Sequence, residues 1–370
     1  MKKVKFLALL LLVSIIILTG CTSINGDSKP TQTGDETPEE NLSAILLIPG
    51  VLGDKSFFDS AYNGLKMIEE QYGATVRVVE MTGDFTKWEP NFMDAVEGDW
   101  DIIFSGSDTS EMLYNYSLRY PDQKFINFDS NMSDAAPNLY SMEYKANELS
   151  FLAGAVAALV TESDMELANE DALIGFLGGM DIPGINDFLI GYIEGAQYIN
   201  PDIKVMVSYA GVFTDPPKGK ELGILQYNSG VDISFNVAGG TGLGLLDAAK
   251  EQNKYAIGVD SDQAVMFEET DPDKSPHILT SAIKKIDYAM LDAVEKHLDG
   301  SLEYGVNVKV GLAEGAVGLA KNVYYEQLSE SDRAIIDELE DKLAKGEIKV
   351  GTAYGLTAEE MNVIRDAVKP

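Results

Sequence analysis

The stretch Ser43-Ala-Ile-Leu-Leu-Ile-Pro-Gly50 is a short apolar run that ends in a Pro-Gly pair. A run closed by such turn residues is typical of a buried strand. Residues 58–72 follow with apolar side chains at helical spacing, which predicts an amphipathic helix. A buried strand followed by such a helix indicates an α/β protein with a parallel sheet.

The same alternation continues along the chain and then restarts. After the first pair we expect strands at 75–81, 100–104 and 124–128, and helices at 86–96 and 109–119. A second set opens with an apolar helix at 148–160 and has strands at 173–177, 204–208, 232–236 and 255–259, separated by helices at 185–199, 217–229 and 241–252. One set ends near residue 145 and the other near residue 275, which predicts two doubly wound lobes.

The last hundred residues are interpreted as a return to the first lobe. We expect residues 278–298 to lead the chain back, and a charged helix at 326–343 to pack against a lobe. The domain prediction is therefore an N-terminal lobe of 42–145 plus about 280–370, and a C-terminal lobe of 146–279. Two lobes joined by several crossings favour a protein that binds a ligand between them.

Charge excludes several classes of partner. The 370 residues include 60 acidic and 28 basic side chains, for a net charge of −32. Phosphate contact needs clustered Lys and Arg, so nucleic acid and anionic lipid are excluded as the main ligand. The single cysteine permits neither an intrachain disulfide nor a Cys-based zinc site.

The N-terminus gives that cysteine a function. Three lysines in residues 1–5 precede a thirteen-residue apolar run at 6–18, which is typical of a secretory signal. The run ends in Leu18-Thr-Gly-Cys21, which resembles the lipobox of bacterial lipoproteins. We therefore predict a signal peptide at 1–20, a lipidated Cys21 and a polar tether at 21–41 that holds the protein on the outer face of the membrane. The alternative is an ordinary signal or an uncleaved anchor followed by a chance cysteine.

Candidate binding residues follow from the sheet topology. Ligands of parallel sheets bind beyond the carboxyl ends of the strands. The residues just after the predicted strands are 50–58, 106–108, 129–131, 178–181, 210–213, 238–241 and 260–262. This set is rich in Asp, Gly and Phe and poor in His, Arg and Lys, which suits a neutral ligand with hydroxyl groups and a flat face.

Several motifs in consistent order extend this interpretation. Residues 53–65 read Gly-Asp-Lys-Ser-Phe-Phe-Asp-Ser-Ala-Tyr-Asn-Gly-Leu, and further matching stretches lie at 120–125, 148–155, 174–179, 191–196, 238–244, 257–263 and 279–284. Together they resemble the basic membrane lipoprotein family, the substrate-binding lipoproteins of ABC importers. The resemblance implies a type I periplasmic-binding fold with a hinge of three crossings, a purine nucleoside as ligand, and a permease as partner.

The resemblance also implies roles for single residues. It assigns base stacking to Phe57 and Phe213, the base edge to Asp129, the ribose to Asp260 and Lys284, and a backbone contact to Gly240. Where the family commonly has Ser-Phe-Asn-Gln, this chain has Ser-Phe-Phe-Asp, so Phe58 loses a hydrogen bond that Asp59 is expected to replace. Ser107-Asp108 stands where the family often has Gly-Phe.

Other interpretations of these residues stay open. A Phe-Phe pair before an amphipathic helix is also typical of a core, a Gly-rich run is typical of a tight turn, and an Asp after a strand is typical of a helix cap. The acidic residues at 268–273 lack the order of a calcium loop, and no cofactor or metal is expected.

Alternatives to an import receptor are a sensory lipoprotein with the same ligand and a nucleosidase that uses carboxylates alone. An enzyme is disfavoured because the chain has only two histidines, His277 and His297, and no G-x-S-x-G elbow.

Overall fold

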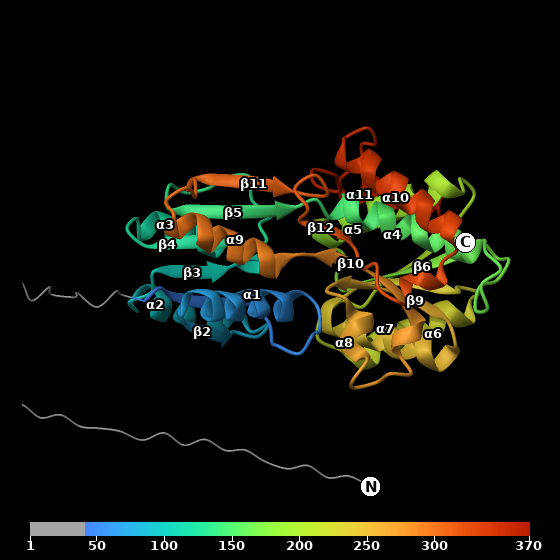
Figure 1. Ribbon diagram of the computed structural model, residues 1–370, viewed down its shortest axis with the longest axis horizontal. Coiled ribbons are helices and arrows are strands. Elements are labelled where there is room, and N and C mark those ends of the chain that lie inside the picture. Colours follow the sequence, from blue (N-terminus) through green and yellow to red (C-terminus); the bar gives the residue numbers. More distant parts are fainter. Residues whose placement is uncertain (1–40) are drawn as a thin grey trace, which may run out of the picture. The chain divides into compact units, whose positions relative to one another are not determined.

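A computed structural model describes residues 41–370, which form one compact unit containing two sheets (Figure 1). The predicted signal peptide, Cys21 and residues 21–40 of the predicted tether lie outside the described residues. No helix within the described range is long and apolar enough to cross a bilayer.

The first sheet has six parallel strands built mainly from the first part of the chain. Its order is β11 (Val306–Val310), β5 (Leu139–Tyr144), β4 (Lys124–Asn127), β3 (Ile102–Ser105), β1 (Ser43–Ile48) and β2 (Thr75–Glu80). Successive residues of β1 face opposite sides of the sheet, so Leu46 packs in one hydrophobic cluster and Leu47 in the other. Helices α1 (Phe57–Tyr72) and α9 (Ile286–Leu298) cover one face, and α2 (Trp88–Val96) and α3 (Ser110–Arg119) cover the other.

The second sheet also has six strands, and its edge strand β12 runs antiparallel to its neighbour. The order is β12 (Val317–Leu319), β10 (Ile278–Lys284), β9 (Tyr255–Asp260), β8 (Ile233–Val237), β6 (Leu173–Gly178) and β7 (Lys204–Tyr209). One face carries α4 (Ala146–Thr161), α5 (Pro183–Ile199), α10 (Glu330–Ala344) and α11 (Ala358–Ala367); the other carries α6 (Pro216–Asn228), α7 (Gly239–Gln252) and α8 (Gln263–Phe267) (Figure 1). Short 3₁₀ turns are η1 (Phe85–Lys87), η2 (Ser107–Thr109), η3 (Ser275–His277) and η4 (Tyr325–Gln327).

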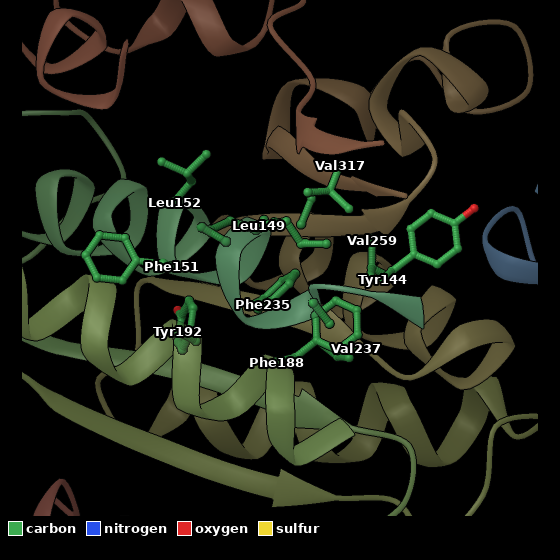
Figure 2. Packing of buried hydrophobic residues seen from close by; sticks show 14 of the residues in the cluster. Tyr144, Leu149, Phe151, Leu152, Phe188, Tyr192, Phe235, Val237, Val259 and Val317 are labelled. Carbon is green, nitrogen blue, oxygen red and sulfur yellow. The ribbon is translucent and has the colours of Figure 1, made fainter. Parts of the chain in front are cut away.

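Helix α4 is buried on nearly every side, as its apolar sequence predicts. Leu149 and Leu152 on α4 are fully buried, and Tyr192 on α5 packs against Phe235 of β8 with ring centroids 5.3 Å apart (Figure 2). Gly191 and Gly195 let the two helices meet backbone to backbone, since a Cβ at Gly195 would lie 1.8 Å from the carbonyl oxygen of Phe151. The second lobe is therefore organised around this helix pair.

The chain passes between the two lobes three times, and the crossings are tied to one another. It crosses after β5, after β10 and between β11 and β12. The backbone N–H of Lys145 donates to Val310 and that of Lys285 to Ala316, both at 2.9 Å. All three connections therefore lie side by side at the hinge.

The predicted division of the C-terminal region needs correction. Only α9 and β11 join the first lobe, whereas β10, β12, α10 and α11 belong to the second. The chain returns because β12 pairs with β10, and because Ile336, Leu339 and Leu343 bury the apolar stripe of α10 in the core shared with α4. The helix predicted at 326–343 begins at Glu330, after a cap by Ser329.

Candidate functional site

A cleft of about 550 Å³ opens where the carboxyl ends of the two sheets face each other. All seven loops that the strand ends predicted contribute to its lining. The volume lies within the range of small-molecule sites, about 300–1,000 Å³. The lining contains Phe57, Phe58, Asp129, Phe213, Gly240, Asp260 and Lys284, seven of the eight predicted ligand-binding residues.

Aromatic rings enter the cleft from both lobes, and two of them, Phe58 and Phe213, lie against a glycine. Phe57 begins α1 and contacts Phe58 edge-on at 5.2 Å between centroids. Phe58 covers Gly50, where a Cβ would lie 2.2 Å from its ring, and Phe213 covers Gly179 at the same distance. The bare glycine backbones thus give both rings room to lie flat against the loops.

Asp129 and Lys284 form an ion pair across the cleft. Asp129 follows β4 of the first lobe, Lys284 ends β10 of the second, and Nζ lies 3.2 Å from Oδ2. Burial raises the pKa of Asp129, while the neighbouring ammonium acts in the opposite direction. Lys284 also lies 5.6 Å from the ring centroid of Phe57 and 5.2 Å from that of Phe188.

Asp260 ends β9 in a left-handed backbone conformation, with φ of 62°. Its Oδ2 accepts a hydrogen bond from the hydroxyl of Ser56 in the first lobe. Burial raises the pKa of this carboxyl, opposed by Lys284 and by the Ser56 hydrogen bond. The alternative prediction that Asp260 caps a helix is wrong. The cap of α8 is Asp262, which accepts a hydrogen bond from the N–H of Val265.

Asp54 organises the loop before α1. Its two oxygens accept the backbone N–H groups of Ser56, Phe58 and Asp59 at 3.0–3.1 Å. Burial raises the pKa of Asp54 to about 6 despite these three hydrogen bonds. The first turn of α1, which carries Phe57, is therefore held by a carboxylate in the cleft wall.

Asp59 does not line the cleft. Its oxygens accept hydrogen bonds from the backbone N–H groups of Gly53 and Lys55, both at 2.8 Å, so Asp59 stabilises the loop that precedes α1. Asp59 is therefore not placed to contact a ligand in the cleft.

The Gly-rich run at 238–244 has two roles. Gly240 lines the cleft at the start of α7, as predicted. Gly242 and Gly244 instead allow close packing, since a Cβ at Gly244 would lie 1.9 Å from the carbonyl oxygen of Pro216.

Sequence reasoning missed several lining residues. Tyr144 ends β5, a strand that was not predicted because polar residues interrupt its apolar sequence. Phe188 lies in α5, away from any strand end. Tyr354 comes from the segment between α10 and α11, which Asp187 fixes by accepting the N–H of Ala353 at 3.0 Å. No local signal connects a residue so late in the chain with a site near its start.

Four carboxylates face one ammonium in this cleft. Asp54, Asp108, Asp129 and Asp260 line it, and Lys284 is the one cationic side chain among the described lining residues. Burial also raises the pKa of Asp108, with a further contribution from Asp129. Such a lining favours hydrogen-bond donors on a ligand and opposes anions.

Neither histidine is part of the cleft lining. Residues 41–370 contain no group of three or more His, Cys, Asp or Glu side chains arranged to hold a metal ion.

The sequence model of the Bmp family, described as PnrA-like ABC transporter substrate-binding proteins, matches residues 41–353. The chain belongs to this family. Basic membrane protein A of Borreliella burgdorferi is 33% identical over 353 residues, covering 94% of this chain and 95% of the relative. The ABC transporter nucleoside-binding protein BmpA of Lactococcus lactis is 30% identical over 335 residues, covering 86% and 91%.

Solved structures agree with this assignment. A solute-binding protein of an ABC transporter system from Aeropyrum pernix K1 superposes with a TM-score of 0.77 at 27% identity, covering 88% of this chain and 97% of that one. A second, from Conexibacter woesei, has a TM-score of 0.67 at 21% identity and shows the fold alone, over 84% of this chain and 99% of its own. The chain is thus an extracytoplasmic ABC substrate-binding protein of the type I fold.

Proposed function

We propose that this protein captures a purine nucleoside between its two lobes and delivers it to a membrane permease. The observation that carries the proposal is a cleft with an aromatic ring from each lobe and four carboxylates around one ammonium. Flat bases stack on such rings, and ribose hydroxyls and base N–H groups donate to carboxylates. The relative named as a nucleoside-binding protein supports the same ligand class.

In this proposal the predicted residues that line the cleft have separate roles, and Lys284 reaches the ribose end of the ligand. Phe57 and Phe213 stack on the base from opposite lobes, Asp129 accepts from the base edge, and Asp260 accepts from ribose hydroxyls. Gly240 offers backbone, and Phe58 supports Phe57 from the side. Nucleotides are disfavoured, because a phosphate would meet four carboxylates and one ammonium that is already paired.

The proposal includes attachment to the membrane through a lipidated Cys21. Mass spectrometry of the protein extracted from the membrane tests this: a diacylated Cys21 is expected, and an unmodified thiol would contradict it.

Calorimetry with the full chain tests the ligand class. Adenosine, guanosine and inosine are titrated beside their free bases, their 5′-monophosphates and ribose. We expect at least one nucleoside to bind far more tightly than about millimolar, and its base, its monophosphate and ribose to bind more weakly. If a peptide or a plain sugar binds and no nucleoside does, the proposal is wrong.

Two further readouts separate import from its alternatives. A measurable base or sugar product after incubation with a nucleoside would place the protein among nucleosidases. Loss of nucleoside uptake on deletion of the gene supports import, whereas unchanged uptake with a lost transcriptional or motile response would identify a sensor.

A further inference from the structure

A buried hydroxyl without a partner lies in the wall of the cleft. Six buried side-chain atoms of the described residues have no hydrogen-bond partner, and Tyr144 Oη is the one that belongs to the cleft lining. Tyr144 is only 3% exposed. Because a buried polar group without a hydrogen-bond partner is unfavourable, this hydroxyl calls for an explanation.

The surroundings of Tyr144 make it a hydrogen-bond donor. Burial raises the pKa of Tyr144 well above its usual range, and the nearby charges of Asp129 and Asp260 add to the effect, so the phenol keeps its proton. Its ring lies at the edge of the apolar cluster with the hydroxyl directed away from Val237 and Val259 (Figure 2).

A second donor lies beside this tyrosine. The ammonium of Lys284 is 5.5 Å from the Tyr144 ring centroid, and its hydrogen bond to Asp129 uses one of three N–H groups. Both residues end a strand at a lobe crossing, β5 for Tyr144 and β10 for Lys284. The part of the cleft next to the hinge, formed by Tyr144 and Lys284, therefore offers hydrogen-bond donors, whereas the charged groups elsewhere in the cleft are carboxylate acceptors.

We infer that the Tyr144 hydroxyl donates a hydrogen bond to an acceptor oxygen of the bound ligand, a hydroxyl or carbonyl oxygen. The inference rests on the proposed nucleoside ligand. The carboxylates then take the donors of the nucleoside while Tyr144 takes one of its oxygens, and the two together fix the orientation of the ligand between the rings.

Tyr144→Phe tests the inference, with Tyr192→Phe as the matched control. Tyr192 also has a buried hydroxyl without a partner, but it packs in the core against Phe235 and does not line the cleft. Calorimetry on the full chains should show about ten-fold weaker nucleoside binding for Tyr144→Phe and unchanged binding for Tyr192→Phe. Thermal unfolding without ligand should change little in either variant.

A set of nucleosides that each lack one oxygen identifies the contact. Inosine is compared with purine riboside and with its 2′-, 3′- and 5′-deoxy forms. We expect one analogue to bind the natural protein more weakly than inosine but to bind Tyr144→Phe as well as inosine does.

Each other outcome overturns the inference. Equal affinity of natural protein and Tyr144→Phe would refute the contact and leave the proposed function intact. An equal loss for every analogue would show that Tyr144 acts through the fold. Absence of binding of any nucleoside to the natural protein would overturn the proposed function and this inference with it.

Discussion

The two walls of the cleft are built differently. The first-lobe wall presents side chains: the rings of Phe57 and Phe58 and the carboxylates of Asp54, Asp108 and Asp129. The second-lobe wall has glycines at Gly211, Gly239 and Gly240, a number of apolar and aromatic side chains, and two charged groups, Asp260 and Lys284. The first wall therefore offers three carboxylate acceptors beside its rings, whereas the second wall offers one carboxylate and one ammonium.

The two charged groups of the second wall also bridge the lobes. Asp260 accepts from Ser56, and Lys284 donates to Asp129, so each charged group of the second wall is bound to the first. A ligand that binds Asp260 must share or replace the Ser56 hydrogen bond. In the proposed function, ligand capture and contact between the lobes therefore use the same two side chains.

The largest expected effect is at Asp260. Asp260→Asn should weaken nucleoside binding about 100-fold, because a charge-assisted acceptor is lost while the size of the side chain stays. Asparagine also tolerates the left-handed backbone at φ of 62°, whereas Asp260→Ala would add strain to the loss. Calorimetry measures the affinity, and thermal unfolding checks the fold.

Asp262→Asn is the matched control for that prediction. Asp262 caps α8 and accepts from Asn322 at 2.7 Å, but it does not line the cleft. It should lower stability and leave affinity unchanged. An affinity loss in Asp262→Asn equal to that in Asp260→Asn would break the assignment of ligand contact to Asp260.

The second largest effect on affinity is expected from removing an aromatic ring, Phe57 from the first wall or Phe213 from the second. Phe57→Ala and Phe213→Ala should each weaken nucleoside binding about 30-fold, since stacking of a base is worth about 1–3 kcal/mol. Binding of ribose, measured by competition, should change little. If only one variant loses affinity, the base stacks on one wall and the ligand is not clamped.

Much of this site follows from strand ends alone. Because parallel strands present their carboxyl ends at one edge, the positions of Asp129 and Asp260 just after predicted strands are enough to place both in the cleft. Tyr144 is not predictable in this way, since the alternating sequence of β5 lacks the apolar run that marks a buried strand. The return of the chain to the second lobe is equally hidden, because β12 has only three residues and no periodicity to detect.

A smaller effect is expected from the glycine behind Phe213. A Cβ at Gly179 would lie 2.2 Å from the Phe213 ring, so Gly179→Ala must displace the ring from the wall. Affinity should fall about ten-fold, less than on removal of the ring. Gly83→Ala is the control, because Gly83 also lines the cleft and a Cβ there meets nothing within 4 Å. Equal affinities of the two alanine variants would show that the position of Phe213 does not matter.

The smallest expected effect is a pH dependence from the first-lobe wall. Burial raises the pKa of Asp54 from 3.8 to about 6, so this carboxyl takes up a proton near pH 6 in the folded protein but near pH 4 in the unfolded chain. Protonation removes an acceptor from the N–H groups that hold the turn of Phe57. Because the charged form holds the loop, affinity should fall as the pH drops, by at most about four-fold between about pH 7.5 and 5.5.

Asp54→Asn separates this contribution from that of the other cleft carboxylates. The amide keeps one acceptor oxygen for the N–H groups of Ser56 and Asp59 but does not titrate, so its affinity should be lower at neutral pH and flatter across the same window. Burial also raises the pKa of Asp129 and of Asp260, but the charge of Lys284 acts against this increase in both. Lys284 has no such effect on the pKa of Asp54. If the affinity of Asp54→Asn changes with pH in parallel with that of the natural protein, Asp54 is not the group responsible. The pH dependence would then come from Asp129 and Asp260, and so from the contacts between the two walls rather than from the loop of the first wall.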